Sequence, residues 1–355
     1  MSQPLLLLSL LFLLFSMITT TKPQPHSNFS AAFYFGDSTL DTGNNAHIST
    51  LVAANHFPYG TDFLPGHNPT GRFSNGRLVP DLLSSKLGLR NLSPPFLDPQ
   101  LSDRDDVLKG ANFASAGSGF DDVTSAVTNT IPIARQLELF KVYLGRLRKV
   151  AGEEEASRIV GSGLVLISAG TNDFLINFYD LPSRRLEFSI GEYQDFVLKK
   201  VESALKELYK LGGRLFAVAG LPPIGCIPLQ ITLHHSFDRT CVEEENADSV
   251  AYNVKLQKLL LKLQQTLPGS KFVYMNSYDA LSEILNNPSK YGFEETKRGC
   301  CGTGLTEVGP LCNFLTPTCQ DASSFVFYDA VHPSEKVYRL ATDYILEHVI
   351  PHLRV

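Results

Sequence analysis

A serine that follows directly on a short apolar run is the first candidate for chemistry in this sequence. Residues 31–35 are apolar and rich in aromatic side chains, which predicts a buried strand, and Gly36-Asp37 then breaks the run sharply. Ser38 would lie at the carboxyl end of that strand, where open α/β sheets form their ligand crevices. The same pattern is also typical of an ordinary strand-to-loop turn. The interpretation of Ser38 as a nucleophile therefore depends on the rest of the chain.

A hydroxyl group becomes a good nucleophile only when a base takes its proton and a further group holds that base in the right tautomer. The sequence has nine histidines, of which His332 alone has a carboxylate three residues before it and a proline and a predicted helix start after it. Asp329-x-x-His332 can place both side chains on one side of a tight turn. We therefore predict that His332 is the base and Asp329 its partner, although such a pair by itself matches by chance in many proteins.

Two further clusters of small or polar residues follow predicted strands. Residues 107–114 can form a strand that leads to Gly117, and the apolar run 164–168 leads to Asn172. The first cluster lacks the third glycine of a dinucleotide-binding fingerprint. If the strands are parallel, Ser38 and both clusters emerge at the same edge of the sheet. A backbone N–H near Gly117 and the carboxamide of Asn172 could then surround an oxyanion beside the serine.

The elements that must position these residues alternate along the chain, which predicts a parallel sheet covered by helices on both faces. Strands are predicted at 31–35, 107–114, 164–168, 215–219 and 272–275, and helices at 78–87, 133–150, 192–211, 243–267 and 334–348. Two long irregular segments interrupt this pattern. We expect residues 41–80 to form one wall of a cleft, and residues 291–324 to be pinned by disulfides and to deliver the chain to Asp329.

Together these segments resemble the GDSL esterase/lipase family of the SGNH-hydrolase superfamily, in its secreted plant form. The matching segments are Phe35-Gly36-Asp37-Ser38 with Asp41-x-Gly43-Asn44-Asn45, Ala114-Ser115-x-Gly117-x-Gly119, Gly170-x-Asn172-Asp173 and Asp329-x-x-His332-Pro333. They occur in the family's order and span nearly all of the chain that follows the N-terminal segment. Thr39 stands where the family name implies leucine, at a position that is not catalytic. We interpret Asp37, Asn44, Asn45 and Asp173 as hydrogen-bonding residues that hold the loops.

The resemblance implies a reaction and a fold. Ser38 would attack the ester carbonyl, His332 would act first as base and then as acid, and Asp329 would orient His332. The backbone N–H groups of Ser38 and Gly117, with the Asn172 side chain, would receive the oxyanion. The implied fold is α/β, a flavodoxin-like three-layer α/β/α sandwich with a five-stranded parallel sheet. The implied chemistry requires no metal and no organic cofactor.

The N-terminal segment indicates secretion. Residues 5–18 are almost continuously apolar, a run shorter than the roughly 17–25 residues of a spanning helix, and they fit the core of a signal peptide. We predict a signal peptide over residues 1–24, cleaved between Thr20 and Pro25, with a retained anchor as the alternative. A single hydrolase domain over residues 25–355 would follow. The expected location is extracellular, which means the cell wall or apoplast if the source is a plant.

Cysteines and glycosylation sequons support the same compartment. The six cysteines are Cys226, Cys241, Cys300, Cys301, Cys312 and Cys319, an even number that predicts disulfides. No Cys-x-x-Cys pair is present, which disfavours a zinc site. Cys226–Cys241 is the most natural local bridge, but six cysteines allow fifteen pairings. N-glycosylation sequons begin at Asn28 and Asn91.

Three functions remain open from the sequence. The first is a secreted serine hydrolase that cleaves carboxylic esters, of lipids or of other acyl compounds, through an acyl-Ser38 intermediate. The second is an acyltransferase that passes the same acyl group to an alcohol. The third is a secreted binding protein on an inactive hydrolase fold, against which the filled catalytic positions argue. The expected partner is a small or polymeric acyl ester, because a net charge of −5 with mixed signs argues against nucleic acid.

Overall fold

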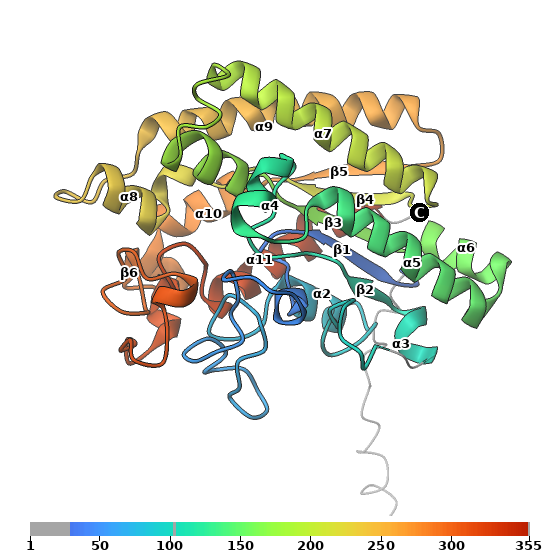
Figure 1. Ribbon diagram of the computed structural model, residues 1–355, viewed down its shortest axis with the longest axis horizontal. Coiled ribbons are helices and arrows are strands. Elements are labelled where there is room, and N and C mark those ends of the chain that lie inside the picture. The colour runs from blue at the N-terminus through green and yellow to red at the C-terminus, as the bar shows by residue number, and fades with distance from the viewer. Residues whose placement is uncertain (1–28, 102–103, 354–355) are drawn as a thin grey trace, which may run out of the picture.

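The computed structural model describes residues 29–101 and 104–353, and a five-stranded parallel sheet forms its centre (Figure 1). The strands are β1 (Ala32–Gly36), β2 (Gly110–Asn112), β3 (Leu164–Ser168), β4 (Leu215–Ala219) and β5 (Lys271–Met275). Their order in the sheet is β2-β1-β3-β4-β5, which is the flavodoxin-like order. The predicted fold class is therefore confirmed. The predicted signal peptide and the Asn28 sequon lie outside the described residues.

Helices cover both faces of this sheet and form the outer layers of the sandwich (Figure 1). The α-helices are α2 (Val79–Lys86), α3 (Arg104–Leu108), α4 (Asp122–Thr128), α5 (Ile133–Ala151), α6 (Glu153–Gly161), α7 (Ile190–Lys210), α8 (Pro228–His234), α9 (Glu243–Thr266), α10 (Ser277–Asn286), α11 (Glu335–His348) and α12 (Ile350–Leu353). Shorter helical turns are η1 (Asn44–His47), η2 (Asp173–Asp180, a π-helix), η3 (Ile224–Cys226), η4 (Pro288–Tyr291), η5 (Gly309–Leu311) and η6 (Ala322–Ser324).

The alternation of side chains along each strand explains the two buried layers. Phe33 and Val165 belong to the core on the face covered by α5, α7 and α9. Tyr34 and Leu166, one residue further along the same strands, belong to the core on the face covered by α2, α11 and α12. Because successive strand residues point to opposite faces, both sides of β1 and β3 are dry. That burial accounts for the continuous apolar runs in the sequence, which are typical of parallel sheets.

The second strand differs from its prediction. The predicted strand at 107–114 begins inside α3, and only Gly110–Asn112 pair with β1. Gly110 has a φ of +94°, and a Cβ at this position would lie 2.0 Å from the carbonyl oxygen of Ala32. The chain therefore turns into the sheet at a point that only glycine can occupy, and the apolar run is divided there.

The irregular segment 291–324 contains a small sheet and two disulfides. β6 (Glu295–Gly299) pairs in parallel with β7 (Phe325–Phe327), and the disulfides are Cys300–Cys319 and Cys301–Cys312. The third disulfide is Cys226–Cys241, the local bridge expected from the sequence. Among the described residues, no group of three or more His, Cys, Asp or Glu side chains could hold a metal ion. In the same part of the chain, no helix has the length and apolar character needed to span a bilayer.

Candidate active site

Ser38, His332 and Asp329 form a hydrogen-bonded chain just beyond the carboxyl end of β1. The Ser38 Oγ lies 2.8 Å from His332 Nε2, across 294 residues of sequence, and His332 Nδ1 lies 2.7 Å from Asp329 Oδ2. All three side chains are buried, and Asp329 is fully so. One imidazole nitrogen faces the carboxylate and the other faces the hydroxyl. In this geometry the imidazole can take the serine proton while the carboxylate holds the tautomer that makes this possible.

The carboxylate of Asp329 is held by four donors. Its Oδ1 accepts the backbone N–H groups of Val331 and His332, at 2.8 and 2.6 Å. Its Oδ2 accepts His332 Nδ1 and also the hydroxyl of Tyr59, at 2.6 Å. A carboxylate offers about four acceptor positions, so this group has no freedom left to rotate away from the imidazole.

Tyr59 is a site residue that the sequence did not identify. Its hydroxyl donates to Asp329 and accepts the backbone N–H of Gly309 at 2.9 Å, which places it between the acid and the cysteine-rich segment. Burial, together with the neighbouring carboxylate, raises the pKa of Tyr59 well above its usual range, so the phenol remains a donor. Tyr59 lies in the irregular segment expected to wall the cleft. No local signal links it to a residue 270 positions away.

The rest of that segment also packs against the histidine. The ring of Phe73 lies 4.6 Å from the imidazole of His332, centroid to centroid. Arg72 makes two hydrogen bonds of 2.7 Å to the carboxylate of Asp81 in the first turn of α2, so the charge of Arg72 is paired there. The hydroxyl of Ser74 donates to the carbonyl of Pro333 at 3.2 Å. The segment therefore forms a wall beside His332.

The candidate donors to an oxyanion are the backbone N–H groups of Ser38 and Gly117 and the side-chain amide of Asn172. Among residues 29–101 and 104–353, the backbone N–H groups of Ser38 and Gly117 have no hydrogen-bond partner. The Asn172 amide donates to the carbonyl of Ser118 at 3.0 Å, which fixes the side chain and leaves its second N–H available. Asn172 lines the same pocket as Ser38 and His332. Gly117 is not among the lining residues, and it is placed here through its neighbour Ser118, whose hydroxyl donates to the carbonyl of Gly36 at 2.8 Å.

A buried carboxylate ties the loop after Ser38 to the turn that contains Gly117. Asp41 is fully buried and accepts backbone N–H groups from Gly43, Asn44, Asn45 and Ala116 at 2.7–3.3 Å. Burial raises the pKa of Asp41 to about 6, and the four N–H donors act against that rise. Because Ala116 immediately precedes Gly117, Asp41 sets the position of that backbone.

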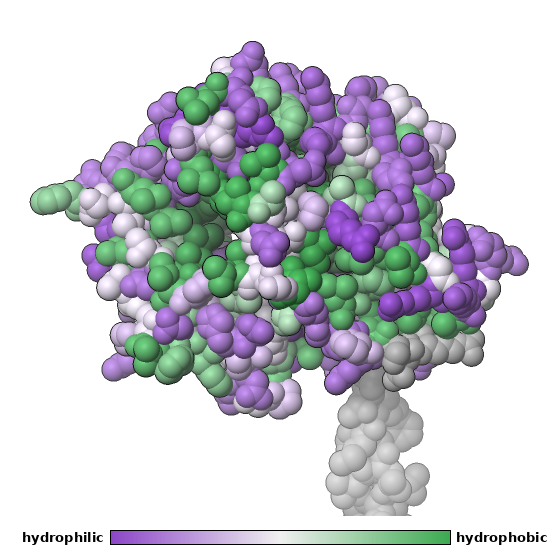
Figure 2. All heavy atoms as spheres, in the orientation of Figure 1, coloured by the Kyte–Doolittle hydropathy of each residue, from purple (hydrophilic) through white to green (hydrophobic). Residues whose placement is uncertain are grey.

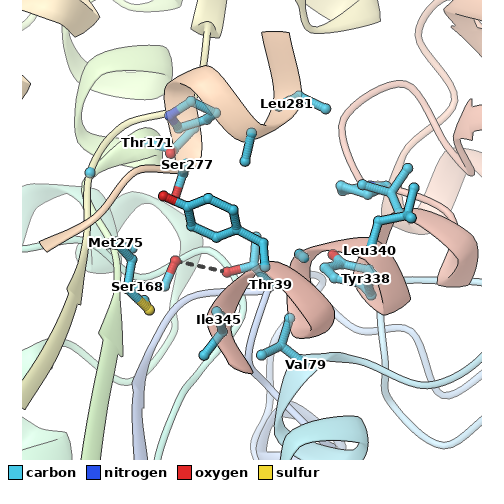
Figure 3. A pocket seen from close by; sticks show the side chains of 18 of the residues that line it. Thr39, Val79, Ser168, Thr171, Met275, Ser277, Leu281, Tyr338, Leu340 and Ile345 are labelled. Carbon is cyan, nitrogen blue, oxygen red and sulfur yellow. Dashed lines mark hydrogen bonds between the residues drawn. The ribbon is translucent and has the colours of Figure 1, made fainter. Parts of the chain in front are cut away.

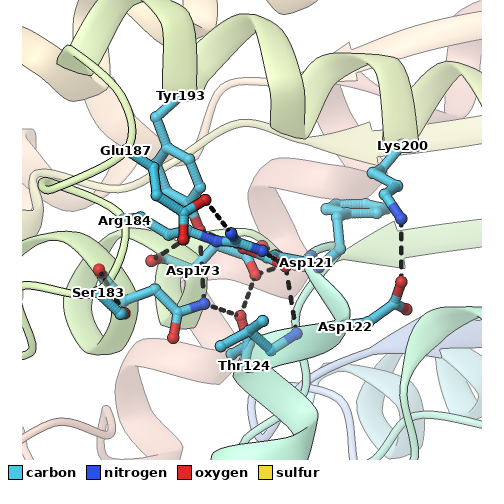
Figure 4. A network of polar contacts seen from close by, with 12 residues as sticks. Asp121, Asp122, Thr124, Asp173, Ser183, Arg184, Glu187, Tyr193 and Lys200 are labelled. Carbon is cyan, nitrogen blue, oxygen red and sulfur yellow. Dashed lines mark hydrogen bonds and ion pairs between the residues drawn. The ribbon is translucent and has the colours of Figure 1, made fainter.

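A second buried carboxylate, Asp173, organises the same turn from the other side (Figure 4). It accepts the N–H groups of Phe120 and Asp121, at 2.8 and 3.0 Å, and the hydroxyl of Thr124 at 2.5 Å. A Cβ at Gly119 would lie 2.0 Å from its Oδ1, so the turn can approach this closely only with glycine. Burial raises the pKa of Asp173 to about 7. Since Asp173 follows Asn172, the two clusters that the sequence placed after separate strands are joined here.

Thr39, the departure from the family pattern, makes contacts that leucine could not. Its hydroxyl donates to Asp37 Oδ1 at 2.8 Å, beside a 3.0 Å bond from its backbone N–H that leucine would also make. The same hydroxyl lies 3.2 Å from the hydroxyl of Ser168, at the end of β3. Burial raises the pKa of Asp37, and the Thr39 hydrogen bonds oppose that rise. Thr39 therefore links the ends of two neighbouring strands directly beneath Ser38.

Comparison with known proteins identifies the family of the chain. The family model for GDSL-like lipase/acylhydrolase matches residues 33–345. GDSL esterase/lipase At2g31550 of Arabidopsis thaliana is 50% identical over 324 residues, which cover 90% of this chain and 88% of the relative. GDSL esterase/lipase At2g30220 of the same plant is 50% identical over 92% of this chain and 90% of the relative. The resemblance drawn from the four motifs is thus confirmed, and the chain belongs to the GDSL-like lipase/acylhydrolase family.

Proposed function

We propose that this chain is a carboxylic ester hydrolase that works through an acyl group carried on Ser38. The observation that carries the proposal is the unbroken hydrogen-bonded chain from the Ser38 hydroxyl through His332 to Asp329, with contacts of 2.8 and 2.7 Å. Membership of a family whose relatives are called esterases or lipases supports the choice of an ester as substrate.

In the acylation step, the Ser38 oxygen attacks the ester carbonyl carbon as its proton passes to His332 Nε2. The negative charge that develops on the carbonyl oxygen is met by the N–H groups of Ser38 and Gly117 and by the Asn172 amide. The tetrahedral intermediate then breaks its bond to the alcohol oxygen. That oxygen leaves with the proton held by His332, while Asp329 stabilises the imidazolium throughout.

In the second step, water replaces the alcohol. His332 takes a proton from the water, whose oxygen attacks the acyl carbon, and returns a proton to the Ser38 oxygen as the carboxylic acid departs. An alcohol in place of water would give acyl transfer instead. Analysis of products with and without an added alcohol acceptor separates the two outcomes.

We further propose that the protein acts outside the cell. Three disulfides hold its loops, which is typical of proteins that mature in an oxidising compartment. Asn91, the sequon residue within the described part of the chain, is exposed and therefore accessible to glycosylation. A shift in electrophoretic mobility of the secreted protein after treatment with a glycosidase tests both points.

Replacement of Ser38 tests the proposed reaction. Ser38→Ala and His332→Ala should abolish turnover of a p-nitrophenyl ester, and Ser38→Ala should also abolish labelling by a fluorophosphonate probe. Ser157→Ala, at an exposed serine on α6, is the matched control and should retain both activities. The circular dichroism spectra of all variants should match that of the wild type. Normal turnover by a folded Ser38→Ala protein would contradict the proposal.

A further inference from the structure

A pocket with a volume of about 540 Å³ extends from Ser38 into the space between α10 and α11 (Figure 3). Its floor is formed by Leu166 in the middle of β3 and by Ala219 and Met275 at the carboxyl ends of β4 and β5. Leu281 and Ile284 of α10 and Leu340 of α11 form its walls. In the space-filling view, hydrophobic side chains gather around a hollow in the region where Figure 1 places α10 (Figure 2). The pocket volume falls within the roughly 300–1,000 Å³ of sites that enclose small molecules.

The lining of the pocket is mostly apolar, and its polar groups include the Tyr338 hydroxyl, which is buried with no hydrogen-bond partner among the described residues. Near Ser38, the hydroxyls of Thr39 and Ser168 are 3.2 Å apart and satisfy one another. At the far end, the exposed carboxylates of Asp279, Asp343 and Glu347 line the pocket, which therefore reaches solvent there. Among the described residues that line it, none is a lysine or an arginine. An anionic group at the far end would meet these carboxylates, and the basic side chains of the lining are the two histidines His332 and His348.

We propose that this pocket binds the acyl chain of an uncharged ester, so that the enzyme prefers esters of longer, neutral fatty acids to acetyl esters and to acyl groups that end in a negative charge. This inference rests on the proposed function, because the pocket gains its meaning from its continuity with Ser38. It adds the class of acyl group, which the family name leaves open.

The chemistry of the two steps favours the acyl group over the alcohol as the occupant. The acyl group stays attached to Ser38 through both steps, whereas the alcohol must leave and be replaced by water beside His332. A mostly apolar pocket beside Ser38 suits a group that stays attached there. Each methylene removed from water contributes about 0.8 kcal/mol, which corresponds to an increase of roughly fourfold in kcat/KM per added methylene until the pocket is filled.

A series of p-nitrophenyl esters tests the proposal, because only the acyl chain changes along it. Acetate, butanoate, octanoate and dodecanoate, each below its aggregation limit, should show kcat/KM rising at least 100-fold from acetate to the best chain. A matched series of acetates of longer alcohols should show no comparable rise. A rise in the alcohol series alone would assign the pocket to the alcohol and overturn the inference.

Filling the pocket with a larger side chain should remove the preference for long acyl chains. Ala341→Trp on α11, and separately Ala280→Trp on α10, place an indole inside the pocket and should lower kcat/KM for dodecanoate at least tenfold, with acetate changed less than twofold. Two variants on different helices guard against one that fails to fold. Ser282→Trp, on α10 but outside the lining, is the control and should keep the wild-type profile.

The exposed carboxylates of Asp279, Asp343 and Glu347 form a charged rim at the far end of the pocket, and their role can be tested separately. The mono-p-nitrophenyl ester of dodecanedioic acid carries a free carboxylate at the far end and should be cleaved at least tenfold more slowly than dodecanoate. In the double variant Asp343→Asn, Glu347→Gln, the ratio of the dodecanoate rate to the rate of this charged ester should become smaller. An unchanged ratio would overturn the role of the rim.

The outcomes distinguish a failure of the acyl pocket from a failure of the proposed function. If acetate turnover depends on Ser38 but chain length has no effect, the proposed function stands and the acyl pocket is wrong. If no ester of any length shows Ser38-dependent turnover, the proposed function itself fails.

Discussion

The two sides of Ser38 are built in different ways. On the base side, Asp329 and His332 lie in a turn held by loops: Tyr59 and Phe73 reach in from one irregular segment, and Gly309 from the disulfide-bonded one. On the proposed oxyanion side, Gly117 and Asn172 lie in the turns that follow β2 and β3, and fully buried carboxylates accept backbone N–H groups around them. The first side depends on contacts between segments that are distant in sequence. The second is fixed by short-range polar contacts at the edge of the core.

In the proposed reaction, this difference matches the chemistry that each side would supply. The base side must hold a proton relay while the charge on the imidazole changes, and it does so with a carboxylate whose acceptor positions are all filled. The oxyanion side must offer donors that do not move as charge appears on the substrate. Rigid backbone at the end of a strand meets that need. We therefore expect perturbations of the base side to alter pH dependence and redox sensitivity, and perturbations of the oxyanion side to lower kcat alone.

The largest effect should come from the acid of the base side. Asp329→Asn keeps the shape of the side chain but presents an amide, which favours the wrong tautomer of His332. We expect kcat to fall by about 10⁴, as the loss of the correct tautomer does in serine hydrolases generally. Steady-state assays with p-nitrophenyl butanoate would measure kcat. A fall below tenfold would mean that Asp329 has no part in the relay.

On the oxyanion side, Asn172→Ala should lower kcat by roughly 10²–10³ with little change in KM, because the lost hydrogen bond forms in the transition state. The pH dependence of kcat should keep its shape, since no proton moves at this residue. Asn286→Ala, at an exposed asparagine that ends α10, is the control. A loss of less than threefold would remove Asn172 from the oxyanion site.

Tyr59→Phe tests how far the loops on the base side tune the relay. Removal of the hydroxyl deletes one donor to Asp329 Oδ2 and leaves more negative charge facing His332, which favours the imidazolium. The acid limb of the pH profile should therefore move to higher pH, and kcat/KM at pH 7 should fall several-fold.

Tyr328→Phe provides the matched control for Tyr59→Phe. Tyr328 is also buried, and its ring lies 5.8 Å from that of Tyr59, but its hydroxyl donates to the carbonyl of Pro58 at 2.5 Å and not to the relay. Its loss should change stability without moving the acid limb. Equal shifts in both variants would show that the effect of Tyr59 is structural.

Reduction of the disulfides should disturb the base side and leave the oxyanion side intact in the same molecule. The Cys301–Cys312 and Cys300–Cys319 bridges hold the segment that places Gly309 against Tyr59, whereas the oxyanion side contains no cysteine. A titration with dithiothreitol should therefore lower activity several-fold before the far-ultraviolet circular dichroism changes. Simultaneous loss of activity and secondary structure would show that the segment has no separate positioning role.

The same contrast explains what the sequence could predict. The apolar runs of β1, β3, β4 and β5 and the periodicity of α5, α7, α9 and α11 define the sheet and its covering layers, since each is a local pattern with one solution. Ser38, Gly117 and Asn172 follow because parallel strands end at one edge. The contact of Tyr59 with Asp329 could not be predicted, because it joins two irregular segments without periodicity. The split of the predicted strand 107–114 depends on a close approach between Gly110 and Ala32 that propensity does not record.

Replacement of Glu245 should have the smallest effect on turnover and a clear effect on stability. It is 3% exposed in the first turn of α9, its Oε2 has no hydrogen-bond partner among the described residues, and His234 of α8 lies 3.5 Å from its Oε1. Burial, together with the neighbouring carboxylates of Asp180 and Asp248, raises the pKa of Glu245 to about 8. α8 in turn supports the base side, because the N–H of Leu229 donates to the carbonyl of Ala330 at 2.9 Å.

The sign of the effect follows from proton binding. Between about pH 4.5 and pH 8, the folded protein holds a proton on Glu245 that the unfolded chain releases. The stability from this group is therefore complete below about pH 4.5 and is lost as pH rises towards 8, by up to about 1.4 kcal/mol per pH unit. Glu245→Gln keeps a neutral side chain of the same shape at every pH. Its free energy of unfolding in urea should match the wild type at pH 5 and exceed it at pH 8.5, with kcat unchanged.

Glu244→Gln, at the exposed neighbouring position, controls for the loss of one negative charge from the same helix turn and should fall with pH nearly as the wild type does. Parallel pH dependence in Glu245→Gln and the wild type would show that Glu245 is already ionised in the folded protein. In that case α9 would hold a buried carboxylate beside the base side on one contact, to His234, whereas Asp41 and Asp329 each accept four donors.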